Sequence, residues 1–395
     1  MKILVVCQHY APEPFRHPDI CEELARRGHE VTVITGQPNY PMGVIYEGYQ
    51  GRKKRQEALN GVQIHRTFTI GRRRGPLFRI LNYYSYALSS AAFVKSMQDK
   101  FDVIFVNQLS PVMMANAAVA YKQMHGTPIV LYCLDLWPES LVAGGIRRGG
   151  GIYNYFHKVS EKIYRQVDKI LVTSRSFSDY FKQEFGIETT EHLPQYAEAI
   201  FCPDQCTKKP DGNMDLMFAG NVGAAQSVNT VIEAAKLTGD VKNLRWHIVG
   251  DGSELGNLKI MAKDLPQIIF HGRKPLSEMP AFYAMADAML VTMQKDPVLS
   301  LTLPGKVQTC MAAGKPVIGA IDGETPLVLK DAQCGLCSPA EDARTLAENV
   351  RKFVISDQAQ MGKNARSYYE RHFRKDLFMD KLEETLNEYA RKGIN

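Results

Sequence analysis

Residues 301–320 carry a lysine at a place where a phosphate could bind. The segment reads LTLPGKVQTCMAAGKPVIGA, in which Pro304 and Gly305 precede a short helical pattern that ends at Gly314. The free backbone N–H groups at a helix N-terminus favour an anion. Lys306 falls in the first turn, where the helix dipole disfavours a cation by roughly a few tenths of a kcal/mol unless an anion is bound. The segment leaves two interpretations open, a phosphate contact and a solvated surface lysine.

Small and cationic residues also follow the other apolar runs of the second half of the chain. In doubly wound folds, ligands bind at the carboxyl ends of the strands, so these positions are informative. Glycine lets a ligand approach the backbone, and arginine or lysine can neutralise a diphosphate. Together with Lys306 and Gly305, the small and cationic residues that follow these runs predict a nucleoside-diphosphate site. The residues are Gly220, Asn221, Gly250, Asp251, Gly252, Glu254, Arg273 and Lys274.

Two common phosphate-binding signatures are missing from the sequence. The first apolar run leads into CQHYAPEPFRH, without the GxGxxG of a dinucleotide-binding helix, and Gly220 and Gly223 do not complete that pattern either. Neither GxxxxGKS nor GxxxxGKT occurs, so the sequence does not indicate a P-loop NTPase. Hydride transfer and P-loop chemistry are therefore disfavoured.

The first half of the chain offers residues that could bind a second substrate. Asp135 follows an apolar run in DLWPES, where a carboxylate could orient or deprotonate an acceptor hydroxyl beside Trp137. The alternative is that Asp135 caps the following turn and Trp137 only packs. Arg16 and His17 follow the first apolar run and could contact the donor phosphates or the acceptor.

The elements that must position these residues alternate along the whole chain. Short β-rich runs and helical patterns follow one another, which is typical of parallel sheets covered by helices on both faces. We expect two Rossmann-like domains over 1–195 and 214–375, separated by a polar, proline-containing linker over 196–213. A last helix, 376–395, is expected to cross back and pack on the first domain.

The composition indicates a globular protein. Hydrophobic residues make up 45% of its 395 residues, enough for a core in each domain. No apolar run approaches the roughly 18–20 residues that span a bilayer, and no secretion signal is visible. The 8 cysteines lie at irregular spacing, which favours free thiols in a reducing cytosol over disulfides, and no zinc-finger spacing predicts a metal site.

Positive charge is concentrated in one segment before a helical pattern. The formal net charge is +6, and residues 52–79 are rich in lysine and arginine with a single acid, Glu57. An aromatic, amphipathic helical pattern follows, and this combination suits the surface of an anionic membrane. The alternative is an ordinary helix on the sheet with solvated arginines, and nucleic-acid binding lacks a recognised module. The arginines expected to face the membrane are Arg72, Arg73, Arg74 and Arg79.

The order of the motifs resembles that of the family 4 glycosyltransferases of the GT-B fold, particularly a WbuB-like bacterial capsule and O-antigen branch. The resemblance implies two Rossmann-like domains whose parallel sheets face a central cleft, with the donor in the C-terminal domain and the acceptor facing the N-terminal one. The motifs that carry it are HYAPEP, LARRGHEVTVIT, DLWPES, FAGNVGAAQSVNTVIEAA, VGDGSE, HGRKPLSEMPAFYAMADAML and LPGKVQTCMAAGKPVI.

The resemblance also implies an activity and its partners. It implies a retaining, metal-independent hexosyltransferase that needs no cofactor besides its co-substrate, a nucleoside-diphosphate sugar such as a UDP-sugar. Arg273 and Lys306 would neutralise the leaving diphosphate. The acceptor would be a polyprenyl-diphosphate-linked glycan of capsule, lipopolysaccharide or exopolysaccharide synthesis. The enzyme would be cytoplasmic and peripheral at the inner face of the plasma membrane.

The sequence departs from the family pattern at several positions. Leu301 and Thr309 stand where many members have a pair of glutamates, the second of which binds the donor ribose, and Thr309 could offer a hydroxyl instead. Asn221 and Gln226 replace an arginine and a lysine that often follow the first strand of the second domain. Two alternatives therefore stay open, a non-hydrolysing sugar-nucleotide 2-epimerase and a degenerate, non-catalytic partner protein.

Overall fold

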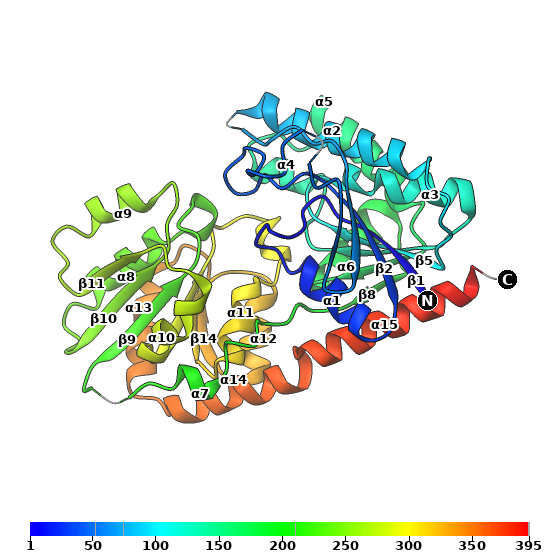
Figure 1. Cartoon of the computed structure of the whole chain (residues 1–395). Coiled ribbons are helices and arrows are strands. Elements are labelled where there is room, and N and C mark those ends of the chain that lie inside the picture. The colour runs from blue at the N-terminus through cyan, green and yellow to red at the C-terminus, as the bar shows by residue number, and fades with distance from the viewer. Residues whose placement is uncertain (52, 74, 210, 394–395) are drawn as a thin grey trace. The chain divides into compact units, whose positions relative to one another are not determined.

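The computed structural model forms two compact units, each built around one sheet (Figure 1). Unit 1 consists of Met1–Leu193 and Met379–Asn395, and unit 2 of Pro194–Phe378. The residues that the structure describes are 1–51, 53–73, 75–209 and 211–393.

Unit 1 is a doubly wound sheet whose described strands follow the order β3-β4-β2-β1-β5-β6-β7-β8. β3 pairs antiparallel with β4, and the other neighbouring pairs of described strands are parallel. Asn60 and Gly61, with φ of 49° and 83°, form the tight turn between β3 and β4, as expected for a two-residue hairpin. The strands are β1 (Lys2–Val6), β2 (Glu30–Thr35), β3 (Gln56–Leu59), β4 (Val62–Arg66), β5 (Val103–Gln108), β6 (Ile129–Cys133), β7 (Lys169–Val172) and β8 (Thr190–His192).

The helices of unit 1 lie between these strands. β5 and β6 are buried along their whole length, and β1 is buried from Ile3 to Val6, as in parallel strands covered on both faces. α1 ends at Arg26, and Gly28 (φ 92°) turns the chain into β2. The helices are α1 (His17–Arg26), α2 (Pro76–Val94), the 3₁₀ helix η1 (Val112–Ala115), α3 (Asn116–His125), α4 (Glu139–Ala143), α5 (Gly151–Tyr164) and α6 (Arg175–Phe185).

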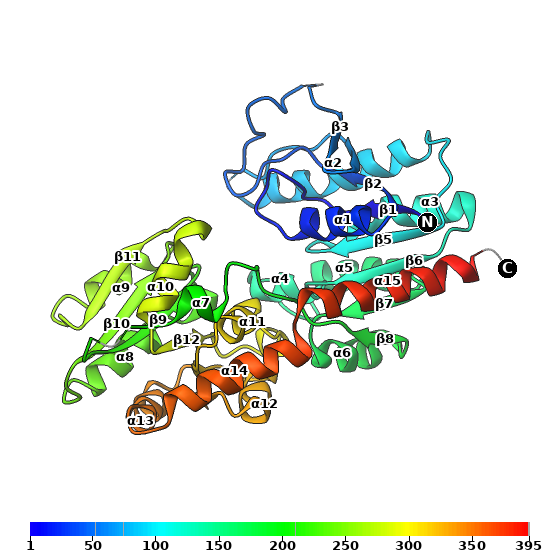
Figure 2. The same cartoon turned by 60° about the horizontal axis from the view of Figure 1, so that its bottom comes forward.

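The last helix, α15 (Lys375–Lys392), joins unit 1 from Met379 onward. Figure 2 shows α15, in red, running beside the strands of unit 1. Glu383 binds Arg27 Nη1 at 2.8 Å and His29 Nε2 at 2.9 Å, and Lys381 binds Glu191 of β8 at 2.7 Å. The expected return of the C-terminal helix to the first domain is thus confirmed.

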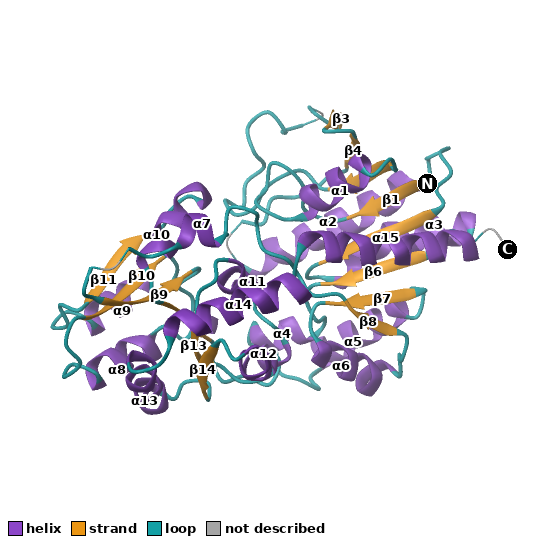
Figure 3. Cartoon of the chain, turned by 90° about the horizontal axis from the view of Figure 1, so that it is seen from below, coloured by secondary structure: helices purple, strands orange, loops and turns teal. Residues whose placement is uncertain are grey.

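Unit 2 contains a parallel sheet with the order β11-β10-β9-β12-β13-β14 among its described strands (Figure 3). In β9, Leu216 and Phe218 belong to one buried cluster and Met217 to the other, because successive side chains of a strand point to opposite faces. The strands are β9 (Met214–Ala219), β10 (Leu244–Val249), β11 (Ile268–Gly272), β12 (Ala288–Thr292), β13 (Val317–Ala320) and β14 (Gly335–Ser338).

Helices cover both faces of this sheet. Residues of α8 and α13 pack in the cluster of Phe218, and residues of α10, α11 and α14 in the cluster of Met217. Two parallel-sheet, Rossmann-like units confirm the predicted fold class. The helices are α7 (Pro203–Cys206), η2 (Ala224–Gln226), α8 (Asn229–Leu237), α9 (Leu255–Met261), η3 (Leu276–Glu278), α10 (Met279–Met285), η4 (Leu299–Leu301), α11 (Gly305–Ala312), α12 (Glu324–Ala332), α13 (Ala343–Val354) and α14 (Gln358–His372).

The segment 196–213, expected as a linker, packs within unit 2. Ala197, Phe201 and Cys206 are buried in the cluster of Met217. Apart from the four-residue helix α7, the described part of this segment is an irregular chain held by single apolar anchors, so its sequence has no sustained period. The chain passes between the units at 193–194 and again at 378–379.

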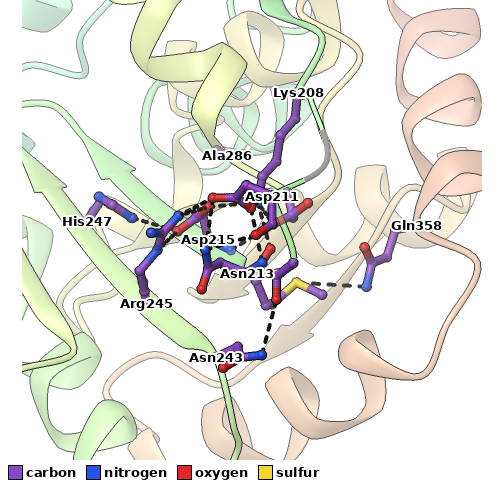
Figure 4. Close-up of polar contacts among 12 residues, drawn as sticks. Lys208, Asp211, Asn213, Asp215, Asn243, Arg245, His247, Ala286 and Gln358 are labelled. Carbon is purple, nitrogen blue, oxygen red and sulfur yellow. Dashed lines mark hydrogen bonds and ion pairs between the residues drawn. The ribbon is translucent and has the colours of Figure 1, made fainter.

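A buried ion-pair network lies at the start of β9 and β10 (Figure 4). The Asp215 carboxylate, 1% exposed, accepts hydrogen bonds from Arg245 Nε at 2.5 Å, Lys208 Nζ at 2.7 Å and His247 Nε2 at 2.9 Å. Burial alone would raise the pKa of Asp215, but the bonds from His247, Arg245 and Lys208 outweigh it and hold that pKa well below its ordinary value. Breaking such a pair typically costs about 3–5 kcal/mol. The network lies at the amino ends of the strands, so its role is to join elements of unit 2.

Candidate functional site

Lys306 lies in the first turn of α11 with its charge enclosed by protein. Its Nζ atom sits 4.2 Å from the centre of the Phe218 ring. It has no hydrogen-bond partner among the described residues. Burial lowers the pKa of Lys306 to about 8. The interpretation as a solvated surface lysine is therefore wrong, and the ammonium lacks the anion that would offset its burial.

Glycines at the ends of β9 and β10 bring neighbouring loops into contact. A Cβ atom on Gly220 would lie 3.1 Å from Lys306 Nζ, so this glycine gives the lysine its space. A Cβ on Gly250 would lie 1.8 Å from the Gly220 oxygen, and one on Gly252 2.3 Å from the Val222 oxygen. The glycines that were expected to admit a ligand at 250 and 252 are thus required by loop packing.

Polar side chains predicted to bind the donor are placed along the same edge of the sheet. Asn221 Nδ2 donates to Gln226 Oε1 at 3.1 Å, and Asp251 accepts from the Gly252 N–H at 2.8 Å. Glu254 lies beside a hollow of about 320 Å³ that Asn229, Asn257 and Gln294 also line. Neither Lys306 nor Arg273 lines this hollow.

Two further cations follow β11. Arg273 is exposed and makes no hydrogen bond or ion pair with the described part of the chain. Lys274 is half-buried, and its Nζ atom lies 5.4 Å from the centre of the Phe282 ring. The Arg273 side chain is therefore open to an anion, while Lys274 is engaged by an aromatic face.

Thr309 does not offer a free hydroxyl proton. The residue is buried, and its Oγ1 donates to the Gly305 oxygen one turn earlier at 3.2 Å. This bond within α11 is the ordinary use of a threonine in a helix. The expectation that Thr309 donates to a ribose in place of the family glutamate is therefore disfavoured.

In unit 1, Asp135 lies after β6 between two serines. Ser110 Oγ and Ser140 Oγ hydrogen-bond to its two carboxylate oxygens, Ser140 at 2.9 Å. Burial raises the pKa of Asp135 despite these bonds. Pro138 holds the N-cap position of α4, and the bond from Ser140 joins the Asp135 side chain to the first turn of that helix, so the capping alternative stays open. Asp135 also ties the loops after β5 and β6 together.

Trp137 and His17, both expected on the acceptor side, are core residues. Trp137 is 2% exposed and meets Tyr83 and Phe156 edge to face. His17 is buried and neither ring nitrogen has a partner among the described residues. Burial lowers the pKa of His17 to about 3, so its ring is neutral and cannot neutralise a phosphate. Arg16 directly precedes α1 and is half-buried.

The loop after β1 holds a pair that the motif analysis missed. His9 Nδ1 lies 3.0 and 3.1 Å from the two carboxylate oxygens of Glu13. Glu13 also accepts hydrogen bonds from the backbone N–H groups of Tyr10, Asn39 and Tyr40, at 3.2, 2.8 and 2.7 Å. The signal available in the sequence was a histidine and a glutamate four residues apart, directly after the first strand.

The basic segment lies beside exposed apolar side chains of α2 and α5. Arg73 and Arg79 are exposed, whereas Arg72 is half-buried with its guanidinium 5.6 Å from the Tyr83 ring centre. Arg74 lies outside the described residues. Tyr84 and Tyr155 hydroxyls, 3.5 Å apart, join the two helices. The exposed apolar residues of this surface are Leu77, Ile80, Leu81, Leu88, Ile152 and Tyr155.

Within the described part of the chain, every helix is too short or too polar to cross a bilayer.

Each half of the chain matches the model of a known protein family. Residues 19–192 match Glycosyltransferase Family 4, and residues 204–368 match Glycosyl transferases group 1. Two Rossmann-like units with these matches define a glycosyltransferase of the GT-B fold. The chain belongs to the family 4 glycosyltransferases, as the motifs predicted.

The matches to similar proteins cover almost the whole chain. The putative colanic acid biosynthesis glycosyl transferase WcaI of Escherichia coli (strain K12) is 26% identical over 400 residues, which cover 95% of this chain and 97% of WcaI. Anabaena HepE in complex with UDP-glucose has a TM-score of 0.70 at 15% identity, with 98% and 100% coverage. WaaG, a glycosyltransferase involved in lipopolysaccharide biosynthesis, has a TM-score of 0.66 at 16% identity, with 98% and 99% coverage. At such identities the solved structures support the fold.

Proposed function

We propose that this protein transfers a sugar from a nucleoside-diphosphate sugar to a lipid-linked glycan acceptor in the synthesis of a bacterial surface polysaccharide. The observation that carries the proposal is the enclosed, unpartnered ammonium of Lys306 beside the N-terminus of α11. The similarity to WcaI, a colanic acid biosynthesis glycosyl transferase by name, supports the polysaccharide, and the UDP-glucose bound to HepE supports a UDP-sugar as donor.

In the proposed reaction, unit 2 stabilises the leaving diphosphate. When the bond between the anomeric carbon and the diphosphate oxygen breaks, its electron pair and negative charge remain on the diphosphate. The first N–H groups of α11 are fixed before the reaction, so they stabilise this charge without reorganising. Lys306 Nζ, which has no hydrogen-bond partner among the described residues, would turn from the Phe218 ring to meet the diphosphate. Arg273, exposed and unpaired among the described residues, would supply a second positive charge. We further propose that transfer is retaining and metal-independent, as the family resemblance implies.

A screen of nucleoside diphosphates tests the donor assignment. We expect UDP, and not GDP or dTDP, to raise the melting temperature, because binding to the folded state alone stabilises it by about 2.7 kcal/mol at 100 times Kd. Product analysis with UDP-sugars, with and without a lipid-linked acceptor, completes the test. A new sugar nucleotide formed without acceptor would indicate a 2-epimerase instead, and no stabilisation by any diphosphate would indicate a non-catalytic partner.

We also propose that the α2–α5 surface, defined by the six exposed apolar residues above together with Arg72, Arg73 and Arg79, lies on an anionic membrane. Its exposed side chains include Leu77 at 63% and Leu88 at 65%. Basic residues near such a membrane contribute about 1 kcal/mol each, and the apolar side chains add burial in the headgroup region. This surface would bring the enzyme to an acceptor that is held in the inner leaflet.

Reversing the charge of this surface is expected to release the protein from membranes. The variant R72E/R73E/R79E should bind phosphatidylglycerol vesicles at least about 100-fold more weakly in a sedimentation assay, since about 3 kcal/mol of attraction is removed. The matched control is K236E/K242E/K263E, which reverses three exposed lysines of unit 2. Equal retention of both variants on the vesicles would contradict the proposal.

A further inference from the structure

The His9–Glu13 pair lies where a doubly wound sheet binds ligands. In unit 1 the chain passes from β1 to β2 on one side, and β5 lies on the other side of β1. The winding therefore reverses between β1 and β5, and ligands bind beyond the carboxyl ends of the strands at such a reversal. His9 and Glu13 belong to the loop that follows β1 at this point.

Glu13 holds the ring of His9 in one orientation. The Glu13 side chain is 1% exposed, and its carboxylate is fixed by three backbone N–H groups, those of Tyr10, Asn39 and Tyr40. An ionised carboxylate only accepts hydrogen bonds, so His9 donates from Nδ1. In the neutral ring, Nε2 is then the nitrogen that accepts.

Aromatic neighbours lock the same ring and leave Nε2 available. Phe15 stacks on His9 with ring centres 4.9 Å apart, and Tyr40 meets it edge to face at 6.0 Å. His9 Nε2 makes no hydrogen bond to any described residue, and this atom is not fully enclosed by protein. Both nitrogens of His17, on the other face of Phe15, are enclosed. Of His9 and His17, His9 is the one with a ring nitrogen that is not enclosed.

We propose that His9 binds the acceptor hydroxyl that receives the sugar, and that Glu13 is its positioning residue. The proposal rests on the proposed transferase function and names the group that meets the acceptor. The hydroxyl donates to Nε2. The bond to the diphosphate oxygen breaks, and the acceptor oxygen forms the new bond to the anomeric carbon on the face that the diphosphate leaves, as retention requires. The electron pair of the broken bond leaves with the diphosphate, and the hydroxyl proton passes to Nε2 and then to solvent. A positioned base of this kind contributes about 10²–10⁴-fold.

Histidine variants of unit 1 test the assignment with two separate readouts. His9→Ala should lower transfer to the acceptor at least 100-fold while UDP still raises the melting temperature as in the unsubstituted protein. His9→Gln can keep a donor toward Glu13 but has no basic nitrogen, so it should be equally slow. His125→Ala, which removes an exposed histidine at the end of α3, should leave both readouts unchanged.

Chemical rescue distinguishes a contact with substrate from a structural role. Added imidazole should restore at least tenfold of the lost rate in His9→Ala, because the space beside Glu13 and Phe15 fits its ring, and should not restore His9→Gln. Three outcomes would each overturn the roles proposed for His9 and Glu13. They are transfer by His9→Ala within about threefold of the unsubstituted protein, loss of its UDP response, and failure of imidazole rescue. Absence of transfer and of UDP binding in the unsubstituted protein would instead overturn the proposed function.

Discussion

Replacing Lys306 with methionine is expected to weaken donor binding and to stabilise the unliganded protein. Burial lowers the pKa of Lys306 to about 8 from an ordinary value of 10.5. Keeping this side chain charged at neutral pH therefore costs the folded state about 3 kcal/mol. Methionine fills a similar volume without the charge, and after the lost contact with Phe218 we expect a net gain of about 1–2 kcal/mol. The measurement is urea unfolding at pH 7.

The same substitution should weaken UDP binding at least about 100-fold and lower transfer by about 10²–10³-fold. It removes a charge-assisted contact that forms fully only as the diphosphate leaves. The control is Lys315→Met, since burial lowers the pKa of Lys315 to about 8 as well. Lys315 Nζ donates to the Ala286 oxygen at 2.7 Å, so its loss leaves a buried carbonyl unpaired. Because the unpaired carbonyl offsets about 1–3 kcal/mol of the same relief, that variant should gain less stability than Lys306→Met and keep its UDP affinity. Unaltered UDP affinity in Lys306→Met would remove Lys306 from the site.

The affinity for UDP is expected to fall as the pH rises above about 8. Below that pH, Lys306 is protonated both free and bound, so this group does not change the affinity. Above it, the free enzyme has lost the proton, and a bound diphosphate, which raises the pKa of Lys306, requires its uptake. The affinity should decrease by up to about tenfold per pH unit until the pKa of the bound state is reached. The second ionisation of a terminal phosphate, near pH 6, lies below this window.

Calorimetry in buffers of different ionisation enthalpy measures this proton directly. At pH 9 we expect uptake approaching one proton per UDP, and at pH 7 an uptake near zero. Lys306→Met should show a flat profile across the same range. The stability of the unliganded protein should move the other way, rising between about pH 8 and 10.5, because the unfolded chain holds the proton there and the folded chain does not. Uptake that persists in Lys306→Met would assign the proton to another group.

Local sequence patterns were enough to predict the fold. The apolar runs of β1, β5 and β6 are buried on both faces, so each is readable without its neighbours. The segment 196–213 was harder, because its anchors Ala197, Phe201 and Cys206 are spaced irregularly and meet their partners far along the chain. Periodicity reports how an element repeats, and such a segment has no repeat.

Side-chain roles at the candidate site depended on contacts that are distant in sequence. Gly250 and Gly252 were predicted to admit a ligand, but what approaches each of them is the backbone of the loop after β9. His17 was predicted as a site residue beside Arg16. In the structure it is His9 that has a ring nitrogen not fully enclosed and a bond to the fixed carboxylate of Glu13. The groups that fix Glu13 include the N–H groups of Asn39 and Tyr40, which lie beyond α1 and β2 in the chain.

The sequence by itself determined the two parallel sheets, the family and the position of Lys306 at the start of α11, because these follow from short-range periodicity and motif order. Only the tertiary structure decided that this lysine is enclosed over Phe218 without a partner. It also decided that Thr309 bonds within α11 and that Trp137 is core. The physical reason is that desolvation and hydrogen-bond satisfaction are set by every atom around a group, and in a folded chain most of those atoms belong to residues distant in sequence.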